Sequence, residues 1–384
     1  MLQYDADAPN RGASKCVATH YEELIIMSIW RWANYFSQTP EIHRITLGEG
    51  DTPLLRSRTF GPARGMNNLF FKMESMNPTG SYKDRFGAAS ISHMLATGRQ
   101  RSIGTSSGNT GAAVAAYCAA AQIDCQIAIV ETAPMGKLKQ MLAYGARLYR
   151  VRGMGTDPKA SEDSMTILRQ KADQPDAQLQ ISAFKFCRPG MEGVKTISYE
   201  LHEQAGDAID HVFVQAGGGG LTLAVADGFG DLVEHGQCRR VPAVHCVQPE
   251  GNDTIAGPLR EGLAEGRNCQ CTSNVSGLQV ASVIDANEVI PACRATGGTG
   301  HLVTDDSVWE TQKALAEGEG IFCEPAGATA LAGALDALRR GEIQADDHVV
   351  CLITGIGFKD DAAVERMNAA RECPLIDPAE LAGI

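Results

Sequence analysis

The feature that most constrains the fold is an alternation of short apolar segments with longer helix-like segments. Strands are predicted at residues 68–73, 102–105, 126–130, 147–151, 211–215, 243–247 and 348–353. Helices are predicted at residues 111–122 and 137–144, and in a segment that ends near Gly98. Parallel strands need a crossover connection, usually a helix, and near-continuous apolar strands are typical of sheets covered on both faces. The alternation therefore predicts an α/β architecture with parallel-rich sheets.

The rest of the chain gives weaker signals. The 384 residues are enough for two domains, or for one large domain with a smaller one inserted. Residues 1–20 are interpreted as a loose extension, and an amphipathic helix is predicted over residues 21–36. The polar, glycine-rich segment 249–277 is predicted to be a surface excursion. After Asp360 we expect one or two helices and no separate regulatory domain.

Charge narrows the range of partners. The formal net charge is −12 and the pI is about 5.3, which argues against a nucleic-acid or anionic-membrane partner. The apolar stretch at residues 24–30 is too short to span a membrane. Because the overall field repels anions, an anionic small-molecule substrate would need a local cationic pocket.

Cysteine usage indicates the compartment. The 12 cysteines are scattered, and most stand in apolar contexts that are typical of small buried residues under reducing conditions. Cys269 and Cys271 form the only close pair, and they lack nearby ligand partners, so no metal site is predicted. No basic flank precedes a long apolar run at the N-terminus. We therefore expect a cytoplasmic protein.

Four segments, far apart in the sequence, follow predicted strands. The carboxyl ends of parallel strands gather at one edge of a sheet, where ligands bind. The first segment contains Lys83, just inside the start of a helix. A helix N-terminus disfavours an ammonium charge, so this lysine should lose its proton easily, as reaction with an aldehyde requires. The alternative is a solvated surface lysine.

The second segment lies between a strand and a helix and is rich in hydrogen-bond donors. It contains Ser106, Ser107, Asn109 and Thr110. Free backbone N–H groups and side-chain donors converge there, an arrangement that suits a carboxylate. The alternative is a tight turn capped by Ser107 or Asn109.

The third segment is a run of glycines between a buried strand and a helix. It consists of Gly217, Gly218, Gly219 and Gly220, followed by Leu221. Without Cβ atoms the backbone can wrap a phosphate at the helix N-terminus, and a plain flexible loop is the alternative. The run is not a Walker loop, because no Lys-Ser/Thr pair follows it.

The fourth segment starts at Thr354, directly after the last predicted strand. A hydroxyl in this position could hydrogen-bond a ring nitrogen of a ligand. A turn that merely ends the strand is the alternative.

In chain order, these motifs resemble those of the threonine synthase family, among the fold-type II pyridoxal-phosphate enzymes. The likeness extends from about Trp30 to Asp360 and rests on residues 47–54, 77–85, 106–111, 193–196 and 354–360. It implies the fold of tryptophan synthase β, with two three-layer α/β domains and pyridoxal 5′-phosphate as cofactor. The implied large domain comprises residues 41–87 and 184–384, and the smaller mobile domain residues 88–183, after an N-terminal extension and helix at 1–40. A homodimer is also implied.

The resemblance implies a role for each motif. Lys83 matches the lysine that holds the cofactor as a Schiff base and later removes the substrate's α-proton. Asn109 matches the partner of the cofactor's phenolic oxygen, and Thr354 the partner of its pyridine nitrogen. The loop at residues 217–221 matches the one that binds the cofactor phosphate. The substrate carboxylate would be bound by Ser106, Ser107 and Thr110.

Two places depart from the family pattern. Threonine synthases usually have asparagines in the phosphate loop, whereas this loop is all glycine, as in serine/threonine dehydratases and serine racemases. The segment that starts at Glu324 also resembles the dehydratases. The family's segment for the substrate phosphate appears here at residues 182–188. Its candidate ligands are Lys185 and Arg188, and a solvated basic pair is the alternative.

The resemblance implies an enzyme that removes the α-proton of an amino acid and then eliminates or replaces a group at Cβ or Cγ. The predicted reaction converts O-phosphohomoserine to threonine and phosphate. A serine/threonine ammonia-lyase, or a β-replacement enzyme, is an alternative from the same class. A non-catalytic ligand-binding module is a third possibility, and the presence of Lys83 argues against it.

Overall fold

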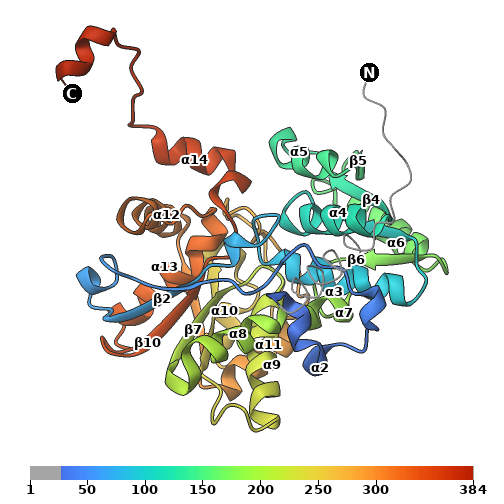
Figure 1. The fold of residues 1–384 in the computed structure, drawn as a ribbon, viewed down its shortest axis with the longest axis horizontal. Coiled ribbons are helices and arrows are strands. Elements are labelled where there is room, and N and C mark those ends of the chain that lie inside the picture. The colour runs from blue at the N-terminus through green and yellow to red at the C-terminus, as the bar shows by residue number, and fades with distance from the viewer. Residues whose placement is uncertain (1–26, 384) are drawn as a thin grey trace, which may run out of the picture.

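Two β-sheets organise the part of the chain that the computed structural model describes, residues 27–383 (Figure 1). The strands are β1 (Leu54–Arg56), β2 (Asn68–Lys72), β3 (Arg101–Gly104), β4 (Asp124–Val130), β5 (Arg147–Val151), β6 (Ala177–Gln180), β7 (His211–Gln215), β8 (Ala243–Pro249), β9 (Gly300–Val303) and β10 (His348–Leu352). The larger sheet has the order β1-β2-β10-β7-β8-β9, and the smaller one β5-β4-β3-β6. Only the β1–β2 pair is antiparallel among these paired strands. The predicted α/β class with parallel-rich sheets is confirmed.

Helices connect most of the strands and cover the sheets. They are α2 (Ala33–Phe36), α3 (Lys83–Ala96), α4 (Asn109–Ala121), α5 (Met135–Ala143), α6 (Pro158–Ala172), α7 (Arg188–Val194), α8 (Thr196–Ala205), α9 (Gly220–Glu234), α10 (Ala256–Arg260), α11 (Ala286–Ala295), α12 (Asp305–Glu319), α13 (Pro325–Arg339) and α14 (Asp361–Asn368). The predicted strands, and the helices predicted at 111–122 and 137–144, match observed elements to within two residues at either end.

The predictions for the N-terminus fall largely outside the described residues. The extension at residues 1–20 and the first part of the helix predicted over 21–36 lie there. The described end of that helix forms two short pieces, the 3₁₀ helix η1 (Ile29–Trp32) and α2. At the other terminus, α14 and a short 3₁₀ helix follow Asp360, as predicted.

Both faces of the larger sheet are covered, because side chains alternate along each strand. Val212 and Val214 of β7 pack in the same fully buried cluster as Phe229 of α9. Phe213, between them, packs on the opposite face with Leu331 of α13. The prediction of a sheet covered on both faces is confirmed.

The smaller sheet uses only residues 101–180, which fall within the segment 88–183. The larger sheet takes strands from both sides of that segment. The two sheets share one continuous core, in which Ile127 of β4 and Val214 of β7 belong to the same buried cluster. The division into a large and a small mobile domain stays a prediction.

One prediction about the surface holds only in part: within segment 249–277, residues 261–265 are exposed, as predicted, but residues 254–259 are buried. The segment 249–277, expected as a surface excursion, contains α10, and both Ile255 and Ala256 are fully buried. The Asn252 side chain is also buried and donates a hydrogen bond to the carbonyl of Leu278 at 2.6 Å. The apolar run around α10 is too short to show helical periodicity. The polar residues around it therefore hide, in the sequence, a buried helix that packs beside β9.

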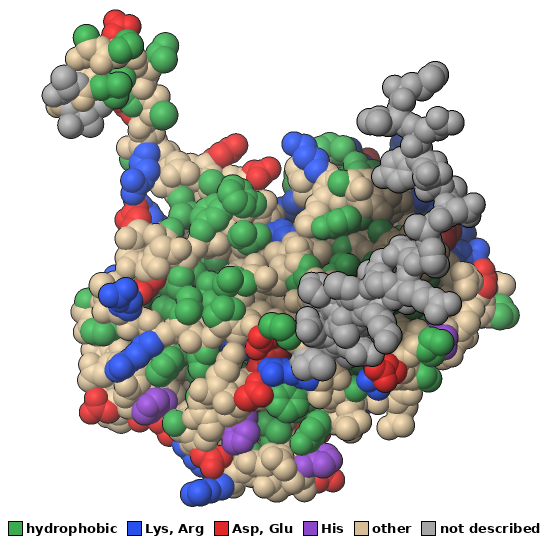
Figure 2. Space-filling view, viewed as in Figure 1, with side chains coloured by type: hydrophobic (Ala, Val, Ile, Leu, Met, Phe, Trp, Pro, Cys, Tyr) green, Lys and Arg blue, Asp and Glu red, His purple; other side chains and the backbone are tan. Residues whose placement is uncertain are grey.

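The visible surface carries charges of both signs. On the face in Figure 2, Lys and Arg side chains lie singly or in small groups among Asp and Glu side chains. Such a face offers no broad cationic surface of the kind that nucleic acids need. Among residues 27–383, no helix is both long and apolar enough to cross a membrane.

A buried ion network anchors the start of α3 to the larger sheet. Arg85 Nη2 lies 2.7 Å from Glu74 Oε1, and Arg85 Nη1 lies 2.6 Å from Glu200 Oε1. Lys72 Nζ lies 2.7 Å from Glu200 Oε2, and all four side chains have no solvent exposure. Since Lys83 is the first residue of α3, this network fixes the position of the predicted reactive lysine.

A chain of three histidines, of which His245 and His301 are buried, crosses three strands of the larger sheet. Arg260 Nη2 lies 3.2 Å from His301 Nδ1, and His301 Nε2 lies 3.2 Å from His245 Nδ1. His245 Nε2 lies 3.0 Å from His211 Nδ1, whose other ring nitrogen lies 3.3 Å from Asp347 Oδ2. Because Arg260 can only donate, each neutral imidazole must accept at Nδ1 and donate at Nε2. Burial, with a smaller effect of Arg260, lowers the pKa of His301 to about 4.

This pKa makes stability fall in mild acid. The unfolded chain binds a proton at His301 near the ordinary pKa of about 6.5, whereas the folded protein does not until about pH 4. The stability that neutral His301 contributes is therefore fully present above pH 6.5 and is lost as the pH falls from 6.5 toward 4. When the pH is lowered from 7.5 to 5, we expect the wild type to lose about 2 kcal/mol more unfolding free energy than His301→Gln loses. Urea unfolding at both pH values measures it, and a difference that does not change with pH contradicts it.

Candidate functional site

A cavity of about 910 Å³ lies at the carboxyl ends of strands from both sheets. Four of the predicted motifs meet in its lining: Lys83, the loop Ser106 to Thr110, the glycine loop with Leu221, and Thr354. These motifs are up to 271 positions apart in the sequence, between Lys83 and Thr354. The structure thus gathers at one place the residues that were predicted from strand ends.

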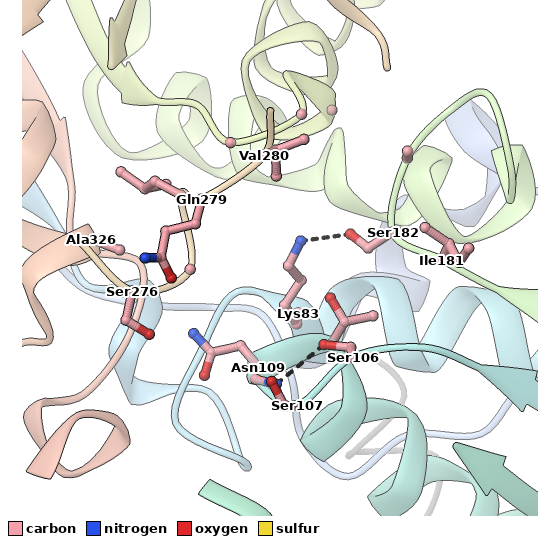
Figure 3. A pocket seen from close by; sticks show the side chains of 18 of the residues that line it. Lys83, Ser106, Ser107, Asn109, Ile181, Ser182, Ser276, Gln279, Val280 and Ala326 are labelled. Atoms are coloured by element: carbon pink, nitrogen blue, oxygen red, sulfur yellow. Dashed lines mark hydrogen bonds between the residues drawn. The ribbon is translucent and has the colours of Figure 1, made fainter. Parts of the chain in front are cut away.

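Lys83 projects into the centre of this cavity (Figure 3). Its Nζ donates a hydrogen bond to Ser182 Oγ at 2.7 Å. Burial lowers the pKa of Lys83 to about 7, against the smaller opposing effects of Glu324 and Asp285. A large fraction of this amine is therefore unprotonated at neutral pH, which is the state that attacks an aldehyde.

Asn109, at the start of α4, lies across the cavity from Ser182 (Figure 3). Its Nδ2 donates to Glu324 Oε1 at 2.7 Å. Burial raises the pKa of Glu324 to about 7. The sequence marks Glu324 only by its dehydratase-like segment and does not indicate its position beside Asn109.

The glycine loop forms an anion cradle at the N-terminus of α9. Gly219 has φ +99°, and a Cβ there would lie 2.8 Å from Val289 Cγ2 and 2.9 Å from Ile255 Cδ1. Among the described residues, the backbone N–H groups of Gly217, Gly218 and Gly219 find no acceptor. Free N–H groups at the positive end of a helix favour an anion such as a phosphate.

Thr354 lies on the floor of the cavity with one unused donor. Gln215 Nε2 donates to Thr354 Oγ1 at 2.5 Å and to the carbonyl of Leu352 at 3.2 Å. The Thr354 hydroxyl accepts this bond, so its own proton remains available for a ligand acceptor. Gln215 Oε1 is buried and has no partner among the described residues. The sequence places Gln215 two positions before the glycine run but does not indicate this role for it.

Two further lysines line the cavity, and neither was predicted. Lys137 Nζ hydrogen-bonds Ser276 Oγ and lies 3.7 Å from Asp360 Oδ2. Lys359 Nζ donates to Gln140 Oε1 at 2.5 Å, and burial lowers its pKa. These amines bring two basic side chains to the cavity lining of an otherwise acidic protein. Lys359 lies within the motif that begins at Thr354, whereas Lys137 belonged to no predicted motif.

Lys185 and Arg188, the predicted phosphate ligands, are not among the residues that line this cavity. Arg188 pairs with Glu192 at 2.9 Å, and its side chain is 67% exposed. Lys185 lines a second, shallower hollow of about 480 Å³ with Arg99 and Arg169. Their role in binding stays a prediction.

The groups in the cavity fit a phosphorylated aromatic aldehyde. Lys83 offers a neutral amine for the aldehyde, the glycine loop offers free N–H groups for a phosphate, and Thr354 offers a hydroxyl proton for a ring nitrogen. The donors of residues 106–110 line the same cavity and can bind a carboxylate. The cavity therefore offers a complementary group for each polar part of pyridoxal phosphate named here.

Comparison with known proteins agrees with this arrangement. A family model described as pyridoxal-phosphate dependent enzyme matches residues 45–355. The threonine synthase of Methanocaldococcus jannaschii is 31% identical over 342 residues, covering 88% of this chain and 82% of that protein. The threonine synthase of Synechocystis sp. is 32% identical over 331 residues, covering 85% and 81%.

A solved structure shares the fold. The processed form of threonine deaminase isoform 2 from Solanum lycopersicum superposes with a TM-score of 0.69, covering 97% of this chain and 98% of that one, at 19% identity. At this identity the likeness concerns the fold alone.

Proposed function

Since the chain belongs to the pyridoxal-phosphate-dependent enzymes of fold type II, and within them to the threonine synthase family, we propose that it converts O-phosphohomoserine and water to threonine and inorganic phosphate. The observation that carries this choice is the pair of lysines, Lys137 and Lys359, in the same cavity as Lys83. A substrate with a phosphate on its side chain needs such cations at a distance from the reactive amine.

The cofactor, when bound, supplies an electron sink for the charge that develops at the substrate's Cα. Lys83 would hold its aldehyde, and the glycine loop would hold its phosphate. Thr354 would orient the ring by donating to its nitrogen and, being neutral, would leave that nitrogen unprotonated. Asn109 would donate to the phenolic oxygen. As a free amine, Lys83 would move the substrate's α-proton as a general base.

The remaining groups select the substrate. Ser106, Ser107 and Thr110 bind its carboxylate, which holds the Cα–H bond near Lys83. Lys137 and Lys359 neutralise the side-chain phosphate, which has to leave from Cγ as an anion. Water then adds at Cβ, so the atoms of substrate and water are fully accounted for in threonine and phosphate.

Product analysis tests the proposal. The enzyme loaded with cofactor should release phosphate from O-phosphohomoserine and form threonine in equal amounts. Serine and threonine at the same concentration should give little 2-oxo acid. Cofactor binding without phosphate release would rule the proposal out.

Lys137→Met should separate binding of the side-chain phosphate from the chemistry. We expect KM for O-phosphohomoserine to rise about 10- to 100-fold, since a charge-assisted hydrogen bond contributes about 1.5–3 kcal/mol. Lys139→Met is the matched control, because Lys139 stands on the same helix, is exposed and does not line the cavity. Equal effects of the two substitutions would show that Lys137 does not contact the phosphate.

Gly219→Ala should weaken retention of the cofactor. The positive φ and the close approach of Val289 together strain the loop by about 1–3 kcal/mol, which predicts a roughly 5- to 150-fold higher dissociation constant for pyridoxal phosphate. Gly236→Ala is the control, because Gly236 also has a positive φ, of +68°, but has open space around it. Titration of the apoenzyme followed by absorbance measures both. Unchanged affinity in Gly219→Ala would contradict the role of the loop.

A second candidate is an ammonia-lyase or dehydratase acting on serine, threonine or a related amino acid. The all-glycine phosphate loop and the buried Glu324 beside Asn109 favour it. It predicts 2-oxo acid and ammonia from an uncharged amino acid, and Lys137→Met should leave that reaction nearly unchanged. A non-catalytic binding protein predicts spectral binding with no turnover of any amino acid.

We also propose that residues 88–183 move as a smaller unit and close over the cavity when substrate binds. Hydrogen exchange in that segment should slow on substrate addition. The expected homodimer predicts a mass twice the 40.9 kDa of one chain by light scattering. A cytoplasmic location is the remaining expectation, and fractionation of the source cells tests it.

A further inference from the structure

A second cluster of ligating side chains lies at the opposite end of the strands from the cavity. His202 belongs to the last turn of α8, and Asp207 to the 3₁₀ helix η5 (Gly206–Ala208), which precedes β7. Cys238 lies in the connection from α9 to β8. Asp207 and Cys238 therefore flank the amino ends of β7 and β8, whereas the glycine loop follows the carboxyl end of β7. Nothing in the proposed reaction uses this cluster.

The three side chains are close enough to share one ion. One ligand atom from each lies within 4.8 Å of the other two. Cys238 Sγ is 3.3 Å from Asp207 Oδ1, a separation that suits two ligands of one tetrahedral metal. The Cys238 side chain is buried, and its thiol also lies 2.8 Å from the carbonyl oxygen of Arg240.

The histidine supplies a second, independent observation. Nδ1 of His202 is buried and has no hydrogen-bond partner among the described residues. A buried ring nitrogen left without a partner destabilises the folded protein, and a metal ion would satisfy it. The Asp207 carboxylate is already oriented, because its Oδ1 accepts a hydrogen bond from the Arg239 backbone N–H at 3.1 Å.

We propose that His202, Asp207 and Cys238 bind one divalent transition-metal ion, with zinc preferred, and that water completes the coordination. One nitrogen, one oxygen and one sulfur ligand make a donor set that favours zinc over magnesium or calcium. When the metal–sulfur bond forms, the Cys238 S–H bond breaks and its proton leaves to solvent, so the step requires no oxidant or reductant. The thiolate and carboxylate charges then balance the charge of the ion.

One neighbour opposes the ion. Arg239 Nε lies 3.3 Å from Asp207 Oδ2, and its positive charge disfavours a second cation at that carboxylate. The Arg239 side chain is 90% exposed, so it can move into solvent when the metal binds. Arg239→Ala should therefore bind the metal about 10-fold more tightly than the wild type.

The role of the metal is structural. It joins the end of α8 to the connection between α9 and β8, two segments that are otherwise linked here by hydrogen bonds of Asp207. No sequence motif predicts the site, because its ligands stand in three separate elements. Turnover should not depend on it, since the cavity lies at the other end of the strands.

The test uses the holoenzyme, stripped of metal by chelation and then titrated with Co²⁺ and Zn²⁺. We expect one equivalent of Co²⁺ to bind with visible d–d bands of a tetrahedral sulfur-containing site, and Zn²⁺ to displace it. Cys238→Ser should weaken binding at least about 100-fold, with turnover unchanged. Cys373→Ser is the control, because Cys373 is an exposed free thiol remote from the cluster in sequence.

Should Cys238→Ser fail to fold, His202→Ala and thiol labelling replace it. Zn²⁺ should protect Cys238, and not Cys373, from alkylation as mapped by mass spectrometry, and His202→Ala should remove that protection. Absence of stoichiometric Co²⁺ binding overturns the proposal. So does Co²⁺ binding that Cys238→Ser and His202→Ala leave intact.

Discussion

Lys83→Ala is expected to lower turnover by about 10⁴-fold or more while the protein still folds. The substitution removes both the amine that joins the cofactor and the general base that moves the α-proton. No other lysine can take over, because Lys137 and Lys359 hold their places through Ser276 and Gln140. Initial rates of phosphate release from O-phosphohomoserine measure the effect.

The control for this experiment is Lys313→Ala. Lys313 lies on α12 with a side chain that is 49% exposed, so its loss should leave the rate unchanged. Added methylamine should restore part of the Lys83→Ala activity, since a free amine can enter a cavity of this size and accept the proton. A Lys83→Ala enzyme that retains more than a tenth of the wild-type rate would show that the catalytic amine lies elsewhere.

Arg85→Met is expected to have the largest effect on stability, about 3–5 kcal/mol. The substitution leaves Glu74 and Glu200 buried, with only Lys72 to compensate two carboxylates. The start of α3 should loosen as well, and with it the position of Lys83, so the cofactor should be held less tightly. Urea unfolding of the holoenzyme measures the first effect, and the cofactor's absorbance after dialysis measures the second.

Arg188→Met is the matched comparison for Arg85→Met. Arg188 also forms an ion pair, with Glu192, but its side chain is 67% exposed, so its loss should change the unfolding free energy by less than about 1 kcal/mol. Similar losses of stability in the two variants would mean that the buried network does not hold α3 in place.

The elements that the sequence predicts correctly are those marked by a pattern within a few neighbouring residues. Strands such as β7 and β10 are near-continuous apolar runs, and their ends are marked by the glycine run and by Thr354. Once the strands are parallel, topology brings those ends together without any further information. This is why Lys83, Asn109 and the glycine loop all line one cavity.

The residues that were missed depend on long-range packing. Ser182 meets Lys83 only because the smaller sheet folds against the start of α3. Lys137 lines the cavity only through the position of α5, and α10 is buried although its segment is polar. Lys185 and Arg188 carry the right charge for a phosphate, but the sequence does not show which way a charged side chain points. Both residues lie outside the cavity lining. Local sequence patterns thus predict the motifs at the strand ends better than the side chains that pack around them.

Borohydride trapping identifies the lysine that holds the cofactor. The purified holoenzyme is reduced with borohydride, digested, and searched by mass spectrometry for a lysine that carries a pyridoxyl group. The site described above predicts a single modified peptide with the group on Lys83. A pyridoxyl group on Lys137, on Lys359 or on any other lysine, or on none, would contradict it.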